Sequence, residues 1–359
     1  MNVEEKLKII KEIGEELINE EELIELLKTK EHPIAYDGFE PSGRIHIAQG
    51  LLRAITVNKL TSVGVHFKFW VADWFALMNN KMGGDLEKIK TVGKYFIEVW
   101  KACGMNLEHV EFLWASENMD QEYWLRTIQI AKANSVKRIT RCAQIMGRSE
   151  SDNLSAAQIF YPCMQASDIF QLGVDIAQLG MDQRKVNVLA REVAPKLGFK
   201  KPIALHHHML LGLSPPQETV EDENTADRAV RLKMSKSNPA SAIFMTDSIT
   251  EVNEKFKKAY CPEGEVKDNP VLEYCKYIVF ERFDTFEIER PEKFGGNIQF
   301  NNYTDLELAF TSKQVHPSDL KNATAKYINK LLDPVRDHFE TNKEAKKLKE
   351  QVLSYQVTK

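Results

Sequence analysis

Short apolar runs alternate with helical patterns from residue 33 onward, and this alternation limits the possible folds more than any other feature of the chain. The run PIAYDGF (33–39) is bounded by Pro and Gly and is typical of a buried strand. Helical spacing follows from Ile47, and HFKFWVAD (66–73) is rich in residues that favour strands. A strand, a helix and a second strand in this order form a unit with parallel strands. The sequence therefore predicts an α/β protein built on a parallel sheet.

The same alternation continues on both sides of a helical interruption. Further strands are predicted at HVEFLWAS (109–116), VDIAQLG (174–180) and PIALHHHML (202–210). Asp85 is placed to cap a helix that stops at Gly104. Between about 118 and 160 the spacing is helical without strands, which indicates an insertion between two halves of the sheet.

Three segments follow from this pattern. Residues 1–30 are predicted to be helical, and residues 31–245 to form the sheet domain, which includes a long polar loop at 211–240. Strand signals fade beyond about residue 246, so residues 246–359 are predicted to form a separate, all-helical domain.

The composition excludes several classes of protein. The chain has 359 residues, of which 43% are hydrophobic and 28% charged, and no apolar run approaches the ~20 residues of a membrane span. The N-terminus is acidic and amphipathic, unlike a secretory signal, and the five cysteines lie apart without a CxxC pair. We therefore expect a cytoplasmic protein without membrane association. The net charge is only −4, so a nucleic-acid partner would have to meet local basic patches.

The stretch PSGRIHIAQG (41–50) places His46 where the first strand passes into its helix. Ligands of parallel α/β sheets bind at the carboxyl ends of the strands, and the free N–H groups of a helix start favour anions. Gly43 would allow a nucleotide to approach the backbone closely. An ordinary loop with a hydrogen-bonded histidine explains these ten residues equally well.

The loop motif KMSKS (233–237) brings two lysines and two serines together. Lysine supplies a mobile positive charge and the hydroxyls add hydrogen bonds, a combination suited to a polyphosphate. Such charge counts most where a pyrophosphate departs. A solvated surface loop is the alternative for the motif alone. The histidines HHH (206–208) cannot share one metal ion, because alternate side chains of a strand point to opposite faces.

A histidine motif after the first strand together with KMSKS after the last resembles the class I aminoacyl-tRNA synthetases. The motif here reads His46-Ile47-Ala48-Gln49, with Ala and Gln where the family has Gly and its second His. Over nearly its whole length the chain resembles the tyrosyl-tRNA synthetases of the archaeal and eukaryotic cytosolic type. The stretches that carry this likeness are YDGFEPSGRIH, IFYPCMQASDIFQLGVDIAQLGMDQRK, KMSKS, RPEKFGG and HPSDLK. The resemblance implies a Rossmann-like catalytic domain with a helical insertion and a helical anticodon-binding domain.

The resemblance also implies a tyrosine site. Its contacts would be Tyr36 and Asp168 at the phenol hydroxyl, Tyr161, Gln165 and Gln183 at the α-amino end, and Glu40 beside the amine. Tyr161, Gln165 and Asp168 share one helical face, which either lines this site or faces solvent; the apolar neighbours Ile169 and Phe170 favour a buried setting. Buried polar partners for the hydroxyl reject the deoxy analogue by orders of magnitude, as is known for this family.

ATP and tRNA(Tyr) are the other partners that the resemblance implies. The ATP contacts would be Gly43, His46, Gln49, Gly180, Asp182, Met209, Leu210, Lys233, Ser235, Lys236 and Ser237. The tRNA contacts would be Arg184 and Lys185 at the acceptor end, and Phe294, His316 and Asp319 at the anticodon. Asp319 or Ser318 capping the last long helix is the alternative for that position.

The implied reaction has two steps and needs no side-chain nucleophile. The tyrosine carboxylate attacks the α-phosphate of ATP, Mg²⁺ accompanies the nucleotide, and the tRNA 3′-terminal adenosine then accepts the acyl group. His46, Lys233 and Lys236 are the candidates for stabilising the first transition state. We expect no dedicated metal site and a homodimer. The alternatives are a tryptophanyl enzyme, a small nucleotidyltransferase and a catalytically silent RNA-binding paralogue.

Overall fold

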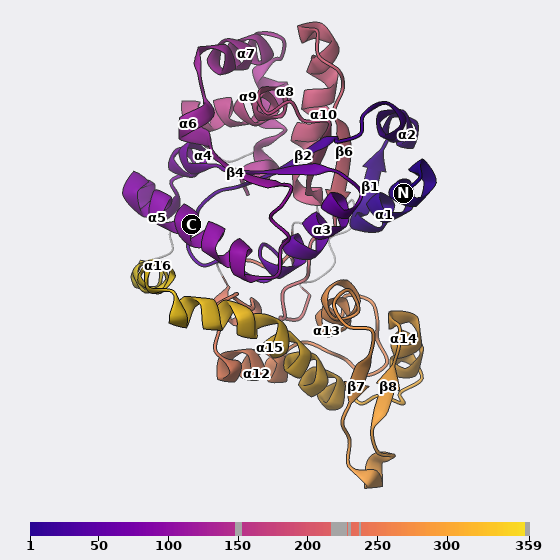
Figure 1. The fold of residues 1–359 in the computed structure, drawn as a ribbon. Coiled ribbons are helices and arrows are strands. Elements are labelled where there is room, and N and C mark those ends of the chain that lie inside the picture. The colour runs from indigo at the N-terminus through magenta and orange to yellow at the C-terminus, as the bar shows by residue number, and fades with distance from the viewer. Residues whose placement is uncertain (148–152, 217–227, 229–230, 237, 356–359) are drawn as a thin grey trace.

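The computed structural model describes residues 1–359 except 148–152, 217–227, 229–230, 237 and 356–359. The strands of its main sheet are β1 (Gly14–Ile18), β2 (Ile34–Phe39), β3 (His66–Val71), β4 (Val110–Trp114), β5 (Ile176–Gly180) and β6 (Ile203–His207). The helices around this sheet are α1 (Val3–Ile13), α2 (Glu20–Thr29), α3 (Leu51–Ser62), α4 (Asp73–Met78), α5 (Leu86–Ala102), α6 (Ala115–Asn118), α7 (Gln121–Lys132), α8 (Val136–Thr140), α9 (Ala156–Gln171) and α10 (Arg184–Val193). The C-terminal part contains α12 (Ile249–Lys258), α13 (Pro270–Tyr274), β7 (Phe286–Ile288), β8 (Ile298–Phe300), α14 (Tyr303–Thr311), α15 (Pro317–Thr341) and α16 (Lys343–Ser354), and lies below the sheet in Figure 1.

The strand order of the main sheet is β1-β6-β5-β2-β3-β4, and β2 to β6 run parallel. The five strands predicted from the apolar runs are therefore confirmed. Strands β3 and β4 continue the sheet on one side of β2, while β5 and β6 continue it on the other. This reversal between β2 and β5 is the place where ligands bind in open α/β sheets. Helices α7, α8 and α9 lie between β4 and β5 in the chain, as expected for an insertion.

The prediction that residues 1–30 are helical is wrong in the middle of that segment. Residues Gly14–Ile18 form β1, which pairs antiparallel with β6, and helices precede and follow it. The main sheet is therefore mixed and not purely parallel. The strand GEELI is too short and too polar to show an alternating pattern, and its pairing with β6 gives it a partner that no local signal reveals.

The C-terminal part is mostly helical, but the prediction missed the antiparallel pair β7 and β8. Each of these strands has three residues, which is shorter than any periodic signal can show. Helix α15 confirms the predicted long helix, and its apolar face is buried. No helix in the described part of the chain is long and apolar enough to cross a bilayer.

Helix α3 starts at Leu51 and not at His46, so the proposed anion site at its first turn needs correction. His46 lies in the preceding turn and forms an isolated antiparallel bridge with Phe244. The amide of Ile47 donates to Ile243 O at 2.8 Å, and the amides of Gln49 and Gly50 both donate to His46 O at 2.9 Å. These N–H groups are bonded within the protein, so side chains must supply most of the anion contacts.

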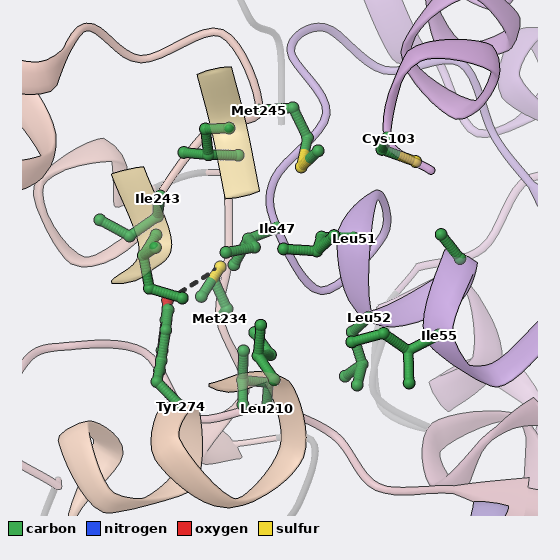
Figure 2. Packing of buried hydrophobic residues seen from close by; sticks show 14 of the residues in the cluster. Ile47, Leu51, Leu52, Ile55, Cys103, Leu210, Met234, Ile243, Met245 and Tyr274 are labelled. Carbon is green, nitrogen blue, oxygen red and sulfur yellow. Dashed lines mark hydrogen bonds between the residues drawn. The ribbon is translucent and has the colours of Figure 1, made fainter. Parts of the chain in front are cut away.

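An apolar cluster anchors the KMSKS loop to the turn before α3. Met234, the second residue of the motif, lies between Ile47, Leu210 and Tyr274 (Figure 2), and its side chain is 3% exposed. Its amide donates to Leu210 O at 2.8 Å, and Lys233 forms a bridge with Leu211. The buried Met234 side chain therefore anchors the backbone from which the side chains of Lys233 and Lys236 extend.

Candidate active site

A cavity of about 830 Å³ opens where β2 and β5 meet. The predicted residues that line it are Tyr36, Glu40, His46, Gln49, Tyr161, Gln165, Asp168, Gly180, Asp182, Gln183, Met209, Leu210, Lys233, Ser235 and Lys236. Gly43 has a φ of +95°, which glycine adopts without strain, but it does not line the cavity. Ser237 lies outside the described residues. Segments far apart in the sequence thus form one site.

The deep end of the cavity carries the groups predicted for a phenol. Tyr36 and Asp168 are 1% exposed, and the Tyr36 hydroxyl finds no hydrogen-bond partner among the described residues. Burial raises the pKa of Asp168 well above its usual range, and burial followed by the nearby Asp168 and Asp37 does the same for Tyr36. The Tyr123 hydroxyl lies 2.9 Å from both Asp168 Oδ1 and Met164 O. A hydroxyl of a ligand would complete this set.

The opposite side of the same pocket is polar and holds a carboxylate. The Tyr161 hydroxyl donates to Glu40 Oε1 at 2.7 Å, and Asn79 Nδ2 donates to both Glu40 oxygens at 3.2 Å. Gln165 Nε2 donates to Gln183 Oε1 at 3.0 Å. Two amide groups and one carboxylate at this end suit an ammonium group.

The two lysines of the loop, one before and one after Met234 in the sequence, both line the cavity. Lys236 Nζ donates to Ser42 Oγ at 3.1 Å and lies 4.6 Å from the centre of the Phe96 ring. Burial, followed by the charge of Lys81, lowers the pKa of Lys236 to about 7, and Glu40 opposes this shift. Lys233 Nζ forms an ion pair of 2.6 Å with Asp182 Oδ2. Both lysines therefore line the cavity, Lys233 as half of an ion pair and Lys236 with an ammonium group that burial makes easier to deprotonate.

Two groups of the turn before α3 have unused polar atoms. Nδ1 of His46 and Oε1 of Gln49 are buried and find no hydrogen-bond partner within the described part of the chain. Burial, followed by the charges of Lys236 and Lys233, holds the pKa of His46 well below its usual range, so the imidazole is neutral. Buried polar atoms are costly without a partner, so both atoms are candidate contacts for a ligand.

Several lining residues were not found from the sequence. Asp37, Arg53 and His207 line the cavity and form one polar group, and Lys81 lines it 3.8 Å from Glu40. Tyr123 lies outside the lining and bonds Asp168. The histidine triplet is one signal in the sequence for this polar group. Arg53 lies in the apolar helix α3, where a charged residue is itself a sign of a buried partner.

The residues predicted for tRNA lie outside this cavity. Arg184 Nε bonds Glu16 at 2.8 Å, and Lys185 follows it at the start of α10. Phe294 is 61% exposed between β7 and β8. Neither Ser318 nor Asp319 caps α15; the cap is His316, whose Nδ1 accepts from the Ser318 amide at 3.1 Å. Within the described residues no group of three or more His, Cys, Asp or Glu is arranged for a metal ion.

Comparisons with known proteins agree with this geometry. The model of the family described as tRNA synthetases class I (W and Y) matches residues 28–333. An Arabidopsis thaliana protein named tyrosine–tRNA ligase 1, cytoplasmic, is 55% identical over 99% of this chain and 90% of its own length. The chain belongs to the class I tyrosyl-tRNA synthetases. The resemblance seen in the sequence is thereby confirmed.

Solved tyrosyl-tRNA synthetases have the same fold. The enzyme from Pyrococcus horikoshii, solved with L-tyrosine, has a TM-score of 0.90 at 37% identity. The match includes 98% of this chain and the full length of that enzyme. The enzyme from Leishmania major, solved with tyrosinol, has a TM-score of 0.89 at 45% identity, and 99% of this chain covers 61% of it. A tryptophanyl-tRNA synthetase from Aeropyrum pernix is 16% identical with a TM-score of 0.65, which is a likeness of fold alone.

Proposed function

We propose that this chain is a tyrosine–tRNA ligase that activates L-tyrosine with ATP and then transfers the tyrosyl group to the 3′ end of tRNA(Tyr). One observation carries the proposal. The phenol-binding pair Tyr36 and Asp168 and the loop lysines Lys233 and Lys236 line one cavity at the reversal of the sheet. Family membership supports the same reaction.

The tyrosine roles follow the two polar ends of the pocket. Tyr36 and Asp168 bind the phenol hydroxyl, and Glu40, Tyr161, Gln165 and Gln183 hold the ammonium end. Binding at both ends fixes the long axis of the amino acid in the cavity that the lysines also line. Fixed geometry of this kind replaces the nucleophile that the reaction does not need.

The ATP roles belong to the other half of the cavity. Gly180 and Asp182 bind the ribose, Met209 and Leu210 flank the adenine, and Ser235 and Gln49 add polar contacts. Neutral His46 and the lysines Lys233 and Lys236 stabilise the negative charge that moves onto the departing pyrophosphate. Mg²⁺ binds with ATP, whose phosphates it neutralises.

The test of the proposed function is tyrosine-dependent exchange between pyrophosphate and ATP. The purified chain should catalyse the exchange with tyrosine, and tryptophan should not replace tyrosine. A nucleotidyltransferase would exchange without tyrosine, and a silent RNA-binding paralogue would not exchange at all. Either result would refute the proposal.

We propose that the end of the β7–β8 hairpin binds the anticodon. Arg290 joins the hairpin to the segment before α15 by bonds of its guanidinium to Gly296 O at 2.9 Å and Gln314 O at 2.8 Å. This link holds Phe294 in the same region as His316 and Asp319. An exposed aromatic ring beside such polar groups suits an unpaired base.

The Phe294→Ala variant should raise the KM for tRNA(Tyr) by about tenfold, because stacking on an aromatic ring stabilises each base by ~1–3 kcal/mol. Aminoacylation measured against tRNA concentration checks this. The Leu308→Ala variant is a matched control, since Leu308 is also an exposed apolar residue of the C-terminal part, at 64%. Exchange of pyrophosphate should be normal in both variants, and an unchanged KM in Phe294→Ala would remove the stacking role.

We also propose a homodimer formed through the helical insertion. Among its described residues, the insertion has five exposed large apolar side chains, namely Trp124, Leu125, Ile128, Val136 and Phe160. Trp124, Leu125 and Ile128 share a face of α7, and exposed apolar surface of this kind marks contact with another protein.

The cytoplasm is the proposed location, supported by the name of the Arabidopsis relative.

The Ile128→Glu variant should convert the dimer to a monomer, because a carboxylate would be buried without a partner in the interface. Light scattering should then give a mass near 41.2 kDa for the variant and twice this value for the unmodified chain. The Ile249→Glu variant, at a residue of α12 that is 53% exposed, should remain dimeric. A monomeric mass for the unmodified chain would contradict the proposal.

A further inference from the structure

The three histidines at the end of β6 have three different environments. His206 Nδ1 lies 2.7 Å from Glu16 and its Nε2 lies 2.9 Å from Asn187. His208 lies 3.3 Å from Glu15 and 3.1 Å from Glu273, and these contacts raise its pKa to about 9 against the effect of burial. His206 and His208 are therefore engaged with carboxylates, and only His207 lines the cavity without one.

The hydrogen-bond partners of His207 determine which ring nitrogen carries the proton. Arg53 Nη1 lies 3.1 Å from His207 Nδ1, and Gln178 Nε2 lies 3.0 Å from the same atom. Guanidinium groups donate and never accept, so Nδ1 must be the acceptor. The Gln178 amide has its orientation fixed as well, because its Oε1 accepts from Arg53 Nη2. Two donors on Nδ1 leave the proton on Nε2.

The charge of the ring is fixed by the same surroundings. Burial, followed by the charge of Arg53, holds the pKa of His207 well below its usual range. Arg53 is itself 1% exposed and paired with Asp37, whose Oδ2 lies 3.3 Å from Arg53 Nε. His207 is therefore a neutral ring with one N–H donor of known position.

The Nε2 atom lies in the half of the cavity assigned to the nucleoside. A Cβ atom added to Gly180 would lie 3.5 Å from His207 Nε2, 2.5 Å from Met209 Sδ and 2.7 Å from Asp182 Oδ1. The donor thus sits among the residues proposed for the ribose and the adenine. Adenosine offers hydrogen-bond acceptors on both its base and its sugar.

We propose that His207 binds the adenosine of ATP by donating its Nε2–H to an acceptor of the nucleoside, and that Arg53 and Gln178 are positioning residues that hold the ring in this tautomer. The inference rests on the proposed function, because it requires ATP in this cavity.

Two substitutions separate binding from support of the fold. Asn places a polar atom near the position of Nδ1 and removes the donor at Nε2, whereas Gln places an N–H near Nε2 and loses the atom at Nδ1. We expect His207→Asn to raise the KM for ATP by about three- to tenfold, the usual effect of one neutral hydrogen bond. We expect His207→Gln to stay closer to the unmodified enzyme in this KM but to melt at a lower temperature, since Arg53 loses a partner.

Pyrophosphate exchange with varied ATP and varied tyrosine measures these effects. The KM for tyrosine should be unchanged, and the control His206→Asn, on the opposite face of β6, should leave the KM for ATP unchanged. A KM for ATP that is normal in His207→Asn, or one that rises together with the KM for tyrosine, would overturn the inference. Loss of exchange in the unmodified chain would instead refute the proposed function.

The tautomer is tested without activity. In ¹⁵N-histidine NMR spectra of the unliganded enzyme, His207 should show a protonated Nε2 and an unprotonated Nδ1. A protonated Nδ1 would overturn the assignment of the donor.

Discussion

Replacing Lys236 with Ala should slow tyrosine-dependent pyrophosphate exchange by about 10²- to 10³-fold, the loss expected when one preorganised group that stabilises transition-state charge is removed. The ammonium group lies in the cavity beside Ser42 and interacts with Glu40, so its loss leaves the phenol contacts of tyrosine in place. The binding of tyrosine, measured by equilibrium dialysis, should therefore be nearly normal. Exchange at the unmodified rate would remove Lys236 from the mechanism.

The pH dependence of ATP binding is a second test of Lys236. The pKa of Lys236 is about 7 in the free enzyme, because burial and Lys81 disfavour the charged form more than Glu40 favours it. ATP is an anion and favours the charged form, so its binding takes up a proton at higher pH. At pH values above 7.5 the KM for ATP should thus increase with pH, by at most tenfold per pH unit. The Lys236→Ala variant should lack this rise.

Replacing Asp168 with Ala should lower the preference for tyrosine over phenylalanine by about 10²-fold or more. Tyrosyl-tRNA synthetases are themselves the usual example of this selectivity, at about 10⁵-fold, and it arises because phenylalanine leaves buried polar groups without partners. In the proposed site those groups are Asp168 and the Tyr36 hydroxyl, whose side chains are each 1% exposed. Exchange rates with both amino acids measure the preference, and an unchanged ratio would refute the role of Asp168.

The melting temperature separates lost selectivity from lost stability. Folding raises the pKa of Asp168, so between the pKa of the unfolded state and that of the folded state the folded protein binds more protons. The folded state therefore loses stability as the pH rises through this interval. At neutral pH the isosteric Asp168→Asn variant removes this penalty and should melt no lower than the unmodified enzyme. Its amide oxygen still accepts a hydrogen bond, so its selectivity should fall less than that of the Ala variant.

Much of the fold and of the site could be predicted from local patterns. The five parallel strands are apolar runs between turn residues, and the cap at Asp85 and the face of α15 follow from spacing. The helical face of Tyr161, Gln165 and Asp168 lines the cavity, as do most residues of the two motifs. Other lining residues, such as Glu40 and Gly180, were implied only by the resemblance to the family. The strands, the cap, the helical faces and the motifs can each be recognised within a short stretch of sequence.

The features that were missed depend on partners distant in the chain. Strand β1 exists because β6 offers an edge, and the start of α3 moves to Leu51 because Ile243 and Phe244 pair with the preceding turn. The role of Arg53 requires Asp37, Gln178 and His207 from three different strands. No pattern along the sequence describes such groups, because their members are brought together only by the tertiary fold.

The adjacency of β2 and β5 has a consequence for the synthesis of the protein. These strands are neighbours in the sheet, yet β3, β4 and the whole insertion separate them in the chain. Contacts between distant segments must wait for the segments between them, and they slow folding. A nascent chain that ends before β5 holds Tyr36 and Glu40 but lacks Gln183 and the loop lysines. Such a chain has no complete tyrosine pocket, so substrate binding cannot assist the early stages of its folding.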